Sequence, residues 1–314
     1  MTNTDGHRTG VTSPLRRGGA GWRNLPHAEN AARMLAWRLA VLISIALGLA
    51  GPAIADDARL PPLRVVSMNL CTDQLAMLIA APGQLHSVSA LAKEAESSVL
   101  AVEAGKYAIN HGFAEEILLM KPDLVLAGRF STRATVSMLR RLGFTVEEFA
   151  PETSFADIHA NMRRMGALLG REARTEALLQ DFDETLARYA PNGQPAKRPL
   201  AALYYANGYT SGGSTLAGEA VERAGFRNLG KELGLAGPAK LSLEALVMNA
   251  PDAIVGEMPD GVPGLAYEVF AHPALAATRA RRGFVRVPNK YTVCGAPFSV
   301  EAVRILAEAR ASLS

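Results

Sequence analysis

A motif that occurs twice constrains the fold of this chain more than any other feature. Glu115 is followed, after six residues, by the run Pro122-Asp123-Leu124-Val125, and the same spacing returns 129 residues later between Glu244 and the run Pro251-Asp252-Ala253-Ile254. A helix that ends at a proline, with an aspartate and a buried strand directly after it, is typical of one half of a βαβ connection. The sequence therefore predicts an α/β fold with two lobes and mainly parallel sheets, and a ligand cleft between the lobes, at the carboxyl ends of the strands.

The segment between the two copies, residues 154–190, has the pattern of a helical bridge. Apolar side chains from Phe155 to Leu169 recur at steps of three and four residues, so they share one helical face. Ser154 is a typical helix start, and Gly170 predicts a break. A second helix, expected from Glu172 to Tyr189, reaches about 27 Å, which is long enough to connect two small lobes. The alternative is a pair of surface helices packed on one large domain.

The first 55 residues are expected to be a leader with a signal peptide. The apolar run Leu39 to Ala50 precedes Ala53-Ile54-Ala55, which has the form of a signal-peptidase site. The run is shorter than the roughly 20 residues that span a bilayer. We therefore expect cleavage after Ala55 and a mature protein outside the cytoplasm. Met34 is an alternative start, and twin-arginine export through Arg16-Arg17 is an alternative to the Sec route.

These features divide the chain into a leader and three further parts. The expected parts are a leader over residues 1–55, an N-terminal α/β lobe over 56–153, a bridging helical segment over 154–190 and a C-terminal α/β lobe over 191–314. With 49% hydrophobic and 20% charged residues, the chain is ordinary for a globular protein and can bury the cores of two domains.

The charge balance argues against nucleic acid as a partner. The whole chain has a formal net charge of +3, but its first 55 residues contain six basic and two acidic residues. The mature part therefore has a formal charge of −1. Nucleic-acid binding usually requires a clustered basic surface, so we expect no nucleic-acid partner.

The chain has two cysteines, Cys71 and Cys294, near opposite ends of its mature part. In an oxidising compartment, pairing is the default expectation. Two free structural thiols, or direct contact with a ligand or metal, are the alternatives. A disulfide at these positions would hold the two lobes at a fixed separation.

A glycine-rich loop over residues 207–214 leads into a helix expected from Leu216 to Ala224. Its spacing fits neither a P-loop nor the dinucleotide fingerprint, so a plain strand-to-helix loop is favoured over a phosphate cradle. Its serines do not form a G-x-S-x-G elbow, and no acid–base constellation accompanies them. We therefore expect no enzymatic activity.

Together these segments resemble the periplasmic substrate-binding proteins that serve ABC importers of vitamin B12, ferric siderophores and haem. In that family two Rossmann-like lobes are joined by one long helix. The resemblance covers residues 64–309 and is specific only as a set. It rests on residues 64–68, 115–117, 121–125, 154–189, 211–212, 243–246 and 251–255.

The resemblance implies a docking role for one glutamate on each lobe. In the family these glutamates enter arginine pockets of the membrane permease, and by position they are Glu115 and Glu244 here. Exposed carboxylates on matching helices suit bidentate recognition by arginine. Glu116 competes for the first role, and the alternative is that these are merely solvated helix residues.

The resemblance also implies a ligand site built from residues after the strand ends. The candidates are Asn69, Tyr107, Asn110, His111, Arg129, Phe130, Tyr209, Thr210, Glu257 and Tyr291. His111 is the most informative, because an exposed histidine can ligate cobalt or iron or hydrogen-bond a chelate. The alternative is that it hydrogen-bonds its own loop. The remaining histidines show no metal-ligand spacing, so we expect no bound metal ion and no resident cofactor.

The function that follows is that of a monomeric, non-enzymatic receptor in the periplasm. It would capture a metal-chelate nutrient, a ferric siderophore or cobalamin, and deliver it to an ABC importer permease. The alternatives are a secreted two-lobed sensory or structural binding protein that is not coupled to transport, because fold does not fix function, and a haem-binding receptor.

Overall fold

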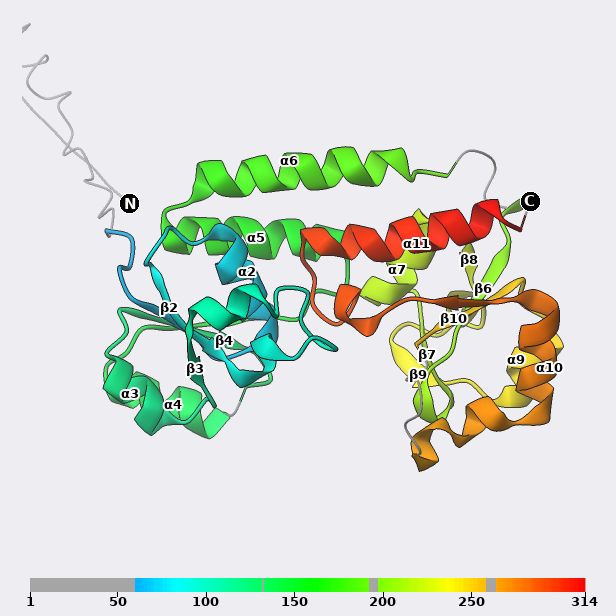
Figure 1. Ribbon diagram of the computed structural model, residues 1–314, viewed down its shortest axis with the longest axis horizontal. Helices are drawn as coiled ribbons and strands as arrows, with labels where there is room; N and C mark the ends of the chain where they lie inside the picture. The colour runs from blue at the N-terminus through cyan, green and yellow to red at the C-terminus, as the bar shows by residue number, and fades with distance from the viewer. Residues whose placement is uncertain (1–59, 132, 192–196, 258–263, 314) are drawn as a thin grey trace, which may run out of the picture. The chain divides into compact units, whose positions relative to one another are not determined.

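The computed structural model describes residues 60–131, 133–191, 197–257 and 264–313. These residues form two parallel sheets, each with its own helices (Figure 1). We call the part around the first sheet lobe 1 and the part around the second sheet lobe 2. The expected signal peptide and the middle of the linker before lobe 2 lie outside the described residues.

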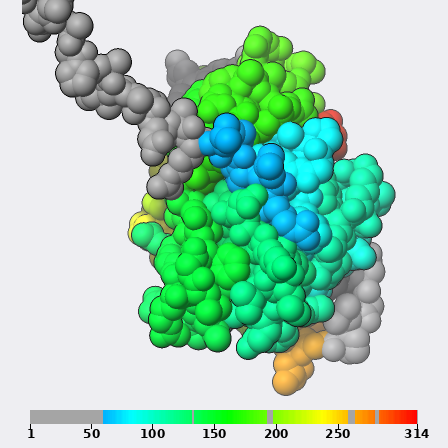
Figure 2. All heavy atoms as spheres, turned by 90° about the vertical axis from the view of Figure 1, so that its left-hand side faces the viewer, coloured from blue at the N-terminus to red at the C-terminus, as the bar shows by residue number. Residues whose placement is uncertain are grey.

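Lobe 1 contains a five-stranded parallel sheet in the order β3-β2-β1-β4-β5. Its strands are β1 (Val65–Ser67), β2 (Leu85–Ser89), β3 (Ala108–Asn110), β4 (Leu124–Gly128) and β5 (Val146–Phe149). Its helices are α2 (Leu70–Ile79), α3 (Ala114–Met120) and α4 (Arg133–Arg141). β1 and β4 are buried throughout, as expected for central strands of a parallel sheet. Figure 2 shows this lobe from its outer side, with residues of α3 and α4 (teal to green) at the surface.

Lobe 2 contains a four-stranded parallel sheet in the order β11-β10-β6-β8 and a separate antiparallel pair, β7 and β9. Its strands are β6 (Leu200–Leu203), β7 (Tyr209–Ser211), β8 (Arg227–Asn228), β9 (Pro238–Lys240), β10 (Ala253–Gly256) and β11 (Phe284–Arg286). Its helices are α7 (Leu216–Arg223), α8 (Leu229–Glu232), α9 (Leu243–Asn249), α10 (Pro273–Arg282) and α11 (Val300–Ala311). The mainly parallel sheets that the sequence predicts are confirmed, whereas the β7–β9 pair was not expected.

The duplicated motif has the same structural role in both lobes. In lobe 1 the Asp123 N–H donates to the Arg64 carbonyl at 2.9 Å, and the Asp123 Oδ2 accepts the Arg64 N–H at 2.9 Å. In lobe 2 the Asp252 N–H donates to the Leu200 carbonyl at 2.7 Å, and its Oδ2 accepts the Leu200 N–H at 2.8 Å. Each aspartate therefore ties the strand that follows its proline to the first strand of its lobe.

The bridging segment is a pair of helices, α5 (Phe155–Leu169) and α6 (Glu172–Arg188), which lie side by side (Figure 1). The Ser154 hydroxyl caps α5, and Gly170 ends it with a φ of 64°, so the predicted start and break are confirmed. α5 packs on α2 of lobe 1, and α6 contacts α11 of lobe 2. The connection thus runs through two helices of similar length, 15 residues in α5 and 17 in α6, and not through a single long helix.

The largest hydrophobic core continues from lobe 1 through the bridging helices into lobe 2. It includes Val65 of β1, Leu203 of β6, and Phe155 and Phe182, whose rings stack 5.7 Å apart between α5 and α6. Moving one lobe against the other would expose part of this apolar surface, which water disfavours. Within the part of the chain that the structure describes, none of the helices has the length and apolar character that a membrane crossing requires.

Candidate functional site

A hollow of about 460 Å³ lies where the start of the bridging segment meets lobe 2. Its volume falls within the range of about 300 to 1,000 Å³ that is typical of small-molecule sites. The described residues that line it are Glu152, Thr153, Tyr205, Ala206, Ser211, Ser214, Thr215, Leu216, Ala217, Pro238, Glu257, Tyr267, Asn289, Thr292 and Val293. This lining carries two carboxylates, several hydroxyl groups and no basic side chain.

The two carboxylates of the lining come from different parts of the chain. Glu152, between β5 and α5, is buried; it accepts hydrogen bonds from Asn161 Nδ2 at 2.7 Å and from the Gly295 N–H at 3.1 Å. Burial raises the pKa of the Glu152 carboxyl above its ordinary value. Glu257 follows β10, and its Oε2 accepts the Asn289 N–H at 2.8 Å. Glu152 was not among the ligand candidates taken from the sequence. Those candidates were chosen because they follow strand ends, and Glu152 also follows a strand end, that of the last strand of lobe 1.

Hydroxyl groups supply most of the remaining polar lining. Burial raises the pKa of Tyr205 to about 12, so this hydroxyl stays neutral at physiological pH. Ser211, Ser214 and Thr292 add aliphatic hydroxyls that both donate and accept. A neutral or cationic ligand rich in hydrogen-bonding groups suits this lining, whereas an anionic group would meet carboxylates without a compensating cation.

The glycine-rich segment connects β6 to α7 as expected, but it is not a plain loop, because Tyr209–Ser211 form β7. The backbone N–H groups of Gly212, Gly213 and Ser214 donate to carbonyl groups of residues 235–237, so these amides are occupied and do not form a phosphate cradle. At Gly212 a side chain would collide with the Leu235 carbonyl, so only glycine permits this close backbone approach.

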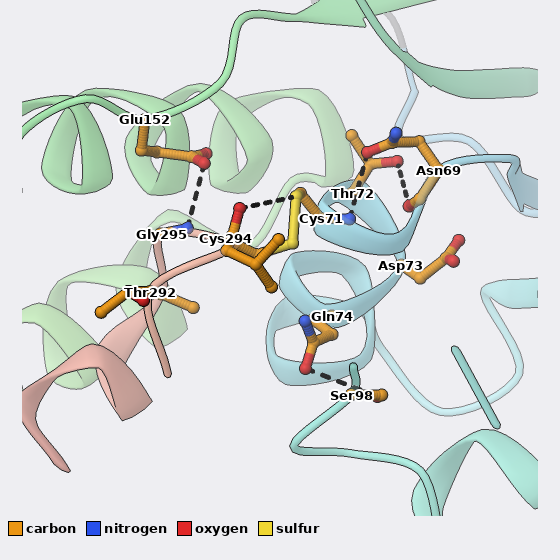
Figure 3. Close-up of a disulfide and its surroundings, with 12 residues drawn as sticks. Asn69, Cys71, Thr72, Asp73, Gln74, Ser98, Glu152, Thr292, Cys294 and Gly295 are labelled. Carbon is orange, nitrogen blue, oxygen red and sulfur yellow. Dashed lines mark hydrogen bonds between the residues drawn. A yellow bond between two sulfur atoms is a disulfide. The ribbon is translucent and has the colours of Figure 1, made fainter. Parts of the chain in front are cut away.

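A disulfide joins Cys71 of α2 to Cys294, which precedes a 3₁₀ turn at Pro297–Ser299, with Cα atoms 5.1 Å apart (Figure 3). The predicted pairing is confirmed, and the alternatives of free thiols or of ligand contact do not hold. Thr292 and Val293, directly before Cys294, line the hollow. The disulfide therefore attaches one wall of the hollow to the first helix of lobe 1.

A buried polar centre lies beneath α2 in lobe 1. Asp73 is fully buried, and its Oδ2 accepts the Ser89 hydroxyl at 2.5 Å and the Ser89 N–H at 3.2 Å. Burial raises the pKa of Asp73 to about 7. Asp73 Oδ1 and the neighbouring Gln74 Nε2 have no hydrogen-bond partner among the described residues. No local sequence pattern marked this centre, because its contacts join segments that are far apart in the chain.

Two lobe 1 candidates are occupied by hydrogen bonds within the lobe. The Asn69 Oδ1 accepts the Cys71 N–H and caps α2. Asn110 is fully buried, and its Nδ2 donates to the Ser67 carbonyl at 2.8 Å and to the Ser87 hydroxyl at 2.9 Å. These asparagines hold the strand ends in place, and ligand contact by them stays a prediction.

The other lobe 1 candidates lie nearer the surface. Tyr107 is half-buried against the core, whereas Arg129 and Phe130 are exposed. His111 is exposed, and its N–H and Nδ1 contact the carboxylate of Glu116 at 2.7 and 3.0 Å. His111 therefore makes local hydrogen bonds, as in the alternative that the sequence left open.

The lobe 2 candidates do not converge either. Tyr209 is partly exposed, with Lys240 Nζ 4.2 Å from its ring centre, and Thr210 is buried. Tyr291 packs partly against the core. Of the ten ligand candidates, Glu257 is the one that lines the described hollow.

The two docking candidates occupy equivalent, exposed places in the first turns of α3 and α9. Because Glu116 is engaged by His111, Glu115 is the freer carboxylate on α3. Hydrogen bonds from its own backbone N–H and from the Ser242 hydroxyl lower the pKa of Glu244, so it is ionised at neutral pH. Neither Glu115 nor Glu244 has an ion-pair partner within the described ranges.

The sequence profile of the periplasmic binding protein family matches residues 65–283, which include most of both lobes. The chain belongs to this family. A cobalamin-binding protein of Halobacterium salinarum is 32% identical over 145 residues, 45% of this chain but only 39% of the relative's length. A vitamin B12-binding protein of Pectobacterium carotovorum is 26% identical over 73% of this chain and 83% of its own length.

Solved structures of the family have the same fold. A periplasmic haem-binding protein of Roseiflexus is 20% identical, with a TM-score of 0.63 over 80% of this chain and 98% of its own. An uncharacterised ABC transporter substrate-binding lipoprotein of Bacillus subtilis is 26% identical over 62% of this chain and 63% of its own length. In the part of the chain that is described, no group of three or more His, Cys, Asp or Glu side chains is placed to hold a metal ion.

Proposed function

We propose that this protein is the solute-binding component of an ABC importer for a metal-chelate nutrient, a ferric siderophore or cobalamin, and that it acts as a monomer in the periplasm. The family match and the two-lobed fold support the receptor role. Relatives named for vitamin B12 favour cobalamin, and a structural neighbour named for haem makes haem the alternative ligand.

The observation that carries the transport role is the matched pair of exposed glutamates. Glu115 and Glu244 stand at the same position of the same helix in each lobe, on α3 and α9. Two exposed carboxylates with this equivalence suit a partner that recognises each lobe through arginine, whose planar guanidinium binds a carboxylate in bidentate fashion. A permease with two such arginine sites is the partner we propose.

The hollow beside Glu257 supports the binding role. Its hydroxyls and carboxylates suit the hydroxyl and amide groups at the edge of a chelate, while Tyr205, Tyr267 and Leu216 offer apolar contact. We propose that the ligand reaches this hollow with part of its surface and contacts lobe 1 through exposed groups such as His111 and Phe130.

The test is direct, because all three chelate classes are coloured. The purified protein is incubated separately with cyanocobalamin, a ferric hydroxamate and haemin, then examined by native mass spectrometry and visible absorption. A 1:1 coloured adduct with cyanocobalamin or the ferric hydroxamate is the expected result. Adduct formation with haemin alone would establish the alternative, and absence of any adduct would overturn the metal-chelate proposal.

A further inference from the structure

We infer that Leu119 and Met248 form the apolar half of the surface with which this protein docks on the permease, a refinement that rests on the proposed transport function. Each side chain lies one helical turn after a docking glutamate, Leu119 after Glu115 and Met248 after Glu244. Both side chains are largely exposed, Leu119 by 81% and Met248 by 83%.

The helices that carry these residues match position by position. α3 and α9 each have seven residues, and each ends at a non-glycine residue with positive φ, Lys121 at 49° and Ala250 at 44°. A proline and the strand-binding aspartate follow in both cases. The same backbone path leaves each helix at the same point of its lobe.

The burial pattern fixes which way each helix faces. Ile117 of α3 and Leu246 of α9, again equivalent positions, are fully buried and anchor the helices to their sheets. Residues four apart lie on one side of a helix, with Cβ atoms about 5 to 6 Å apart. Each lobe therefore displays a carboxylate and a large apolar side chain next to each other, turned away from the anchor.

Neither apolar side chain contributes to a core. Leu119 and Met248 are absent from the hydrophobic clusters of the described residues and from the partly buried residues packed against them. A single exposed apolar residue on a protein surface is ordinary. Two of them at equivalent positions, each paired with a carboxylate, are not explained by folding.

The chemistry of the pair defines the occupant. A carboxylate beside a leucine or methionine fits a protein surface on which an arginine borders an apolar recess. Burying the apolar side chain would exclude water from the adjacent charge pair, which strengthens the ion pair and places the glutamate in register. Methionine is common at such contacts because its flexible thioether adapts to the partner.

Figure 1 shows α3 and α9 on the side of the two sheets that faces away from α6. One partner surface can therefore approach both helices without meeting the bridging helices. This placement favours a single permease over two separate partners.

The test uses the full-length chain with Leu119→Ser and Met248→Ser, singly and together, and the importer's permease in lipid nanodiscs. Docking is measured by biolayer interferometry, ligand binding by absorption and folding by thermal melting. We expect docking about tenfold weaker in the double variant, with unchanged ligand affinity and melting temperature. Leu119→Met and Met248→Leu should keep docking close to wild type.

The matched control is Leu60→Ser. Leu60 is 90% exposed and precedes Pro61, which lies against Gly170 between α5 and α6, so this variant should dock normally. Unchanged docking of the Leu119 and Met248 variants would overturn the inference, as would a loss that follows altered ligand affinity or melting temperature. Binding to empty nanodiscs that these variants abolish would point to a lipid surface instead and also overturn it.

The glutamate variant separates this inference from the proposed function. If Glu115→Ala with Glu244→Ala weakens docking while the serine variants do not, the apolar contact fails and the transport proposal stands. If neither set weakens docking, the docking surface itself is wrong, and the proposed function loses its principal support.

Discussion

The two lobes are built on the same backbone unit but place their polar groups differently. Both tie a central strand to its neighbour through an aspartate after a proline, Asp123 in lobe 1 and Asp252 in lobe 2. In lobe 1 the polar side chains beside the strand ends, such as Asp73 and Asn110, are buried and hydrogen-bond to residues of β1 and β2. In lobe 2 those near the strand ends, such as Glu257, line an open hollow.

This difference indicates that the duplicated unit determines the backbone fold of each lobe. The segments after the strands determine which polar groups are buried and which line the hollow. The β7–β9 pair and the glycine-rich loop of lobe 2 carry Ser211 and Ser214, which line the hollow. Lobe 1 has no counterpart among its described strands, and α2 packs directly over its sheet. We interpret lobe 1 as the anchor, and lobe 2 as the part that supplies most of the lining of the described hollow.

The largest effect is expected from removing the covalent link between these two regions. The double variant Cys71→Ala with Cys294→Ala removes the disulfide between two residues that are 223 positions apart. For a loop of this length, the chain-entropy account gives a loss of up to about 5 kcal/mol in the free energy of unfolding. Urea denaturation measures this, and the wild type in reducing agent should match the variant. An unchanged midpoint after reduction would mean that the shared core alone holds the lobes together.

The buried carboxyl of lobe 1 should make stability depend on pH. The pKa of Asp73 rises from 3.8 to about 7 on folding, so between these values the unfolded chain releases a proton that the folded chain retains. Stability therefore falls as pH rises from about 4 to 7 and stays lower above it, by at most about 4 kcal/mol for this group. Asp73→Asn should flatten the profile measured by urea denaturation at pH 4.5, 6 and 8.

A residual slope is expected in Asp73→Asn, because the raised pKa of Glu152 acts in the same direction. Identical pH profiles for wild type and variant would show that burial of Asp73 does not perturb its protonation. The pH dependence of stability would then come from other groups, such as Glu152.

Docking should involve both lobes equally, in contrast to their different interiors. Glu115→Ala with Glu244→Ala is expected to weaken permease docking by a factor of about 10 to 100 and to leave ligand affinity intact, because each change removes one charge-assisted contact. Glu172→Ala with Asp181→Ala, on exposed positions of α6, is the matched control. Uptake that is unchanged in the docking variant would contradict the docking role.

The smallest effect expected is on ligand affinity when a single lining group is changed. Glu257→Gln should weaken binding of the chelate identified by absorption about fivefold, as expected for loss of one hydrogen-bonded charge. His111→Ala, its counterpart on lobe 1, should have less effect, because His111 is held by Glu116. A larger loss with His111→Ala, measured by titration, would place the main ligand contacts on lobe 1.

The sequence by itself determined the elements whose signals are local. The Ser154 cap, the Gly170 break and the repeated proline–aspartate motif each depend on residues within a few positions of one another, and all are confirmed. The cysteine pair was predictable because only two cysteines exist in a chain expected to be exported.

Only the tertiary structure decided which polar groups are buried and which line the hollow. Asn110 ends β3, and Thr210 lies in the middle of β7, a strand that the sequence did not predict; both are buried. Adjacent strand residues face opposite sides, so a shift of one position exchanges inside and outside. Glu152 accepts a hydrogen bond from the Gly295 N–H, 143 residues away, and Asp73 of α2 accepts one from the Ser89 hydroxyl of β2. Such contacts depend on how distant segments pack, and no local periodicity encodes that packing.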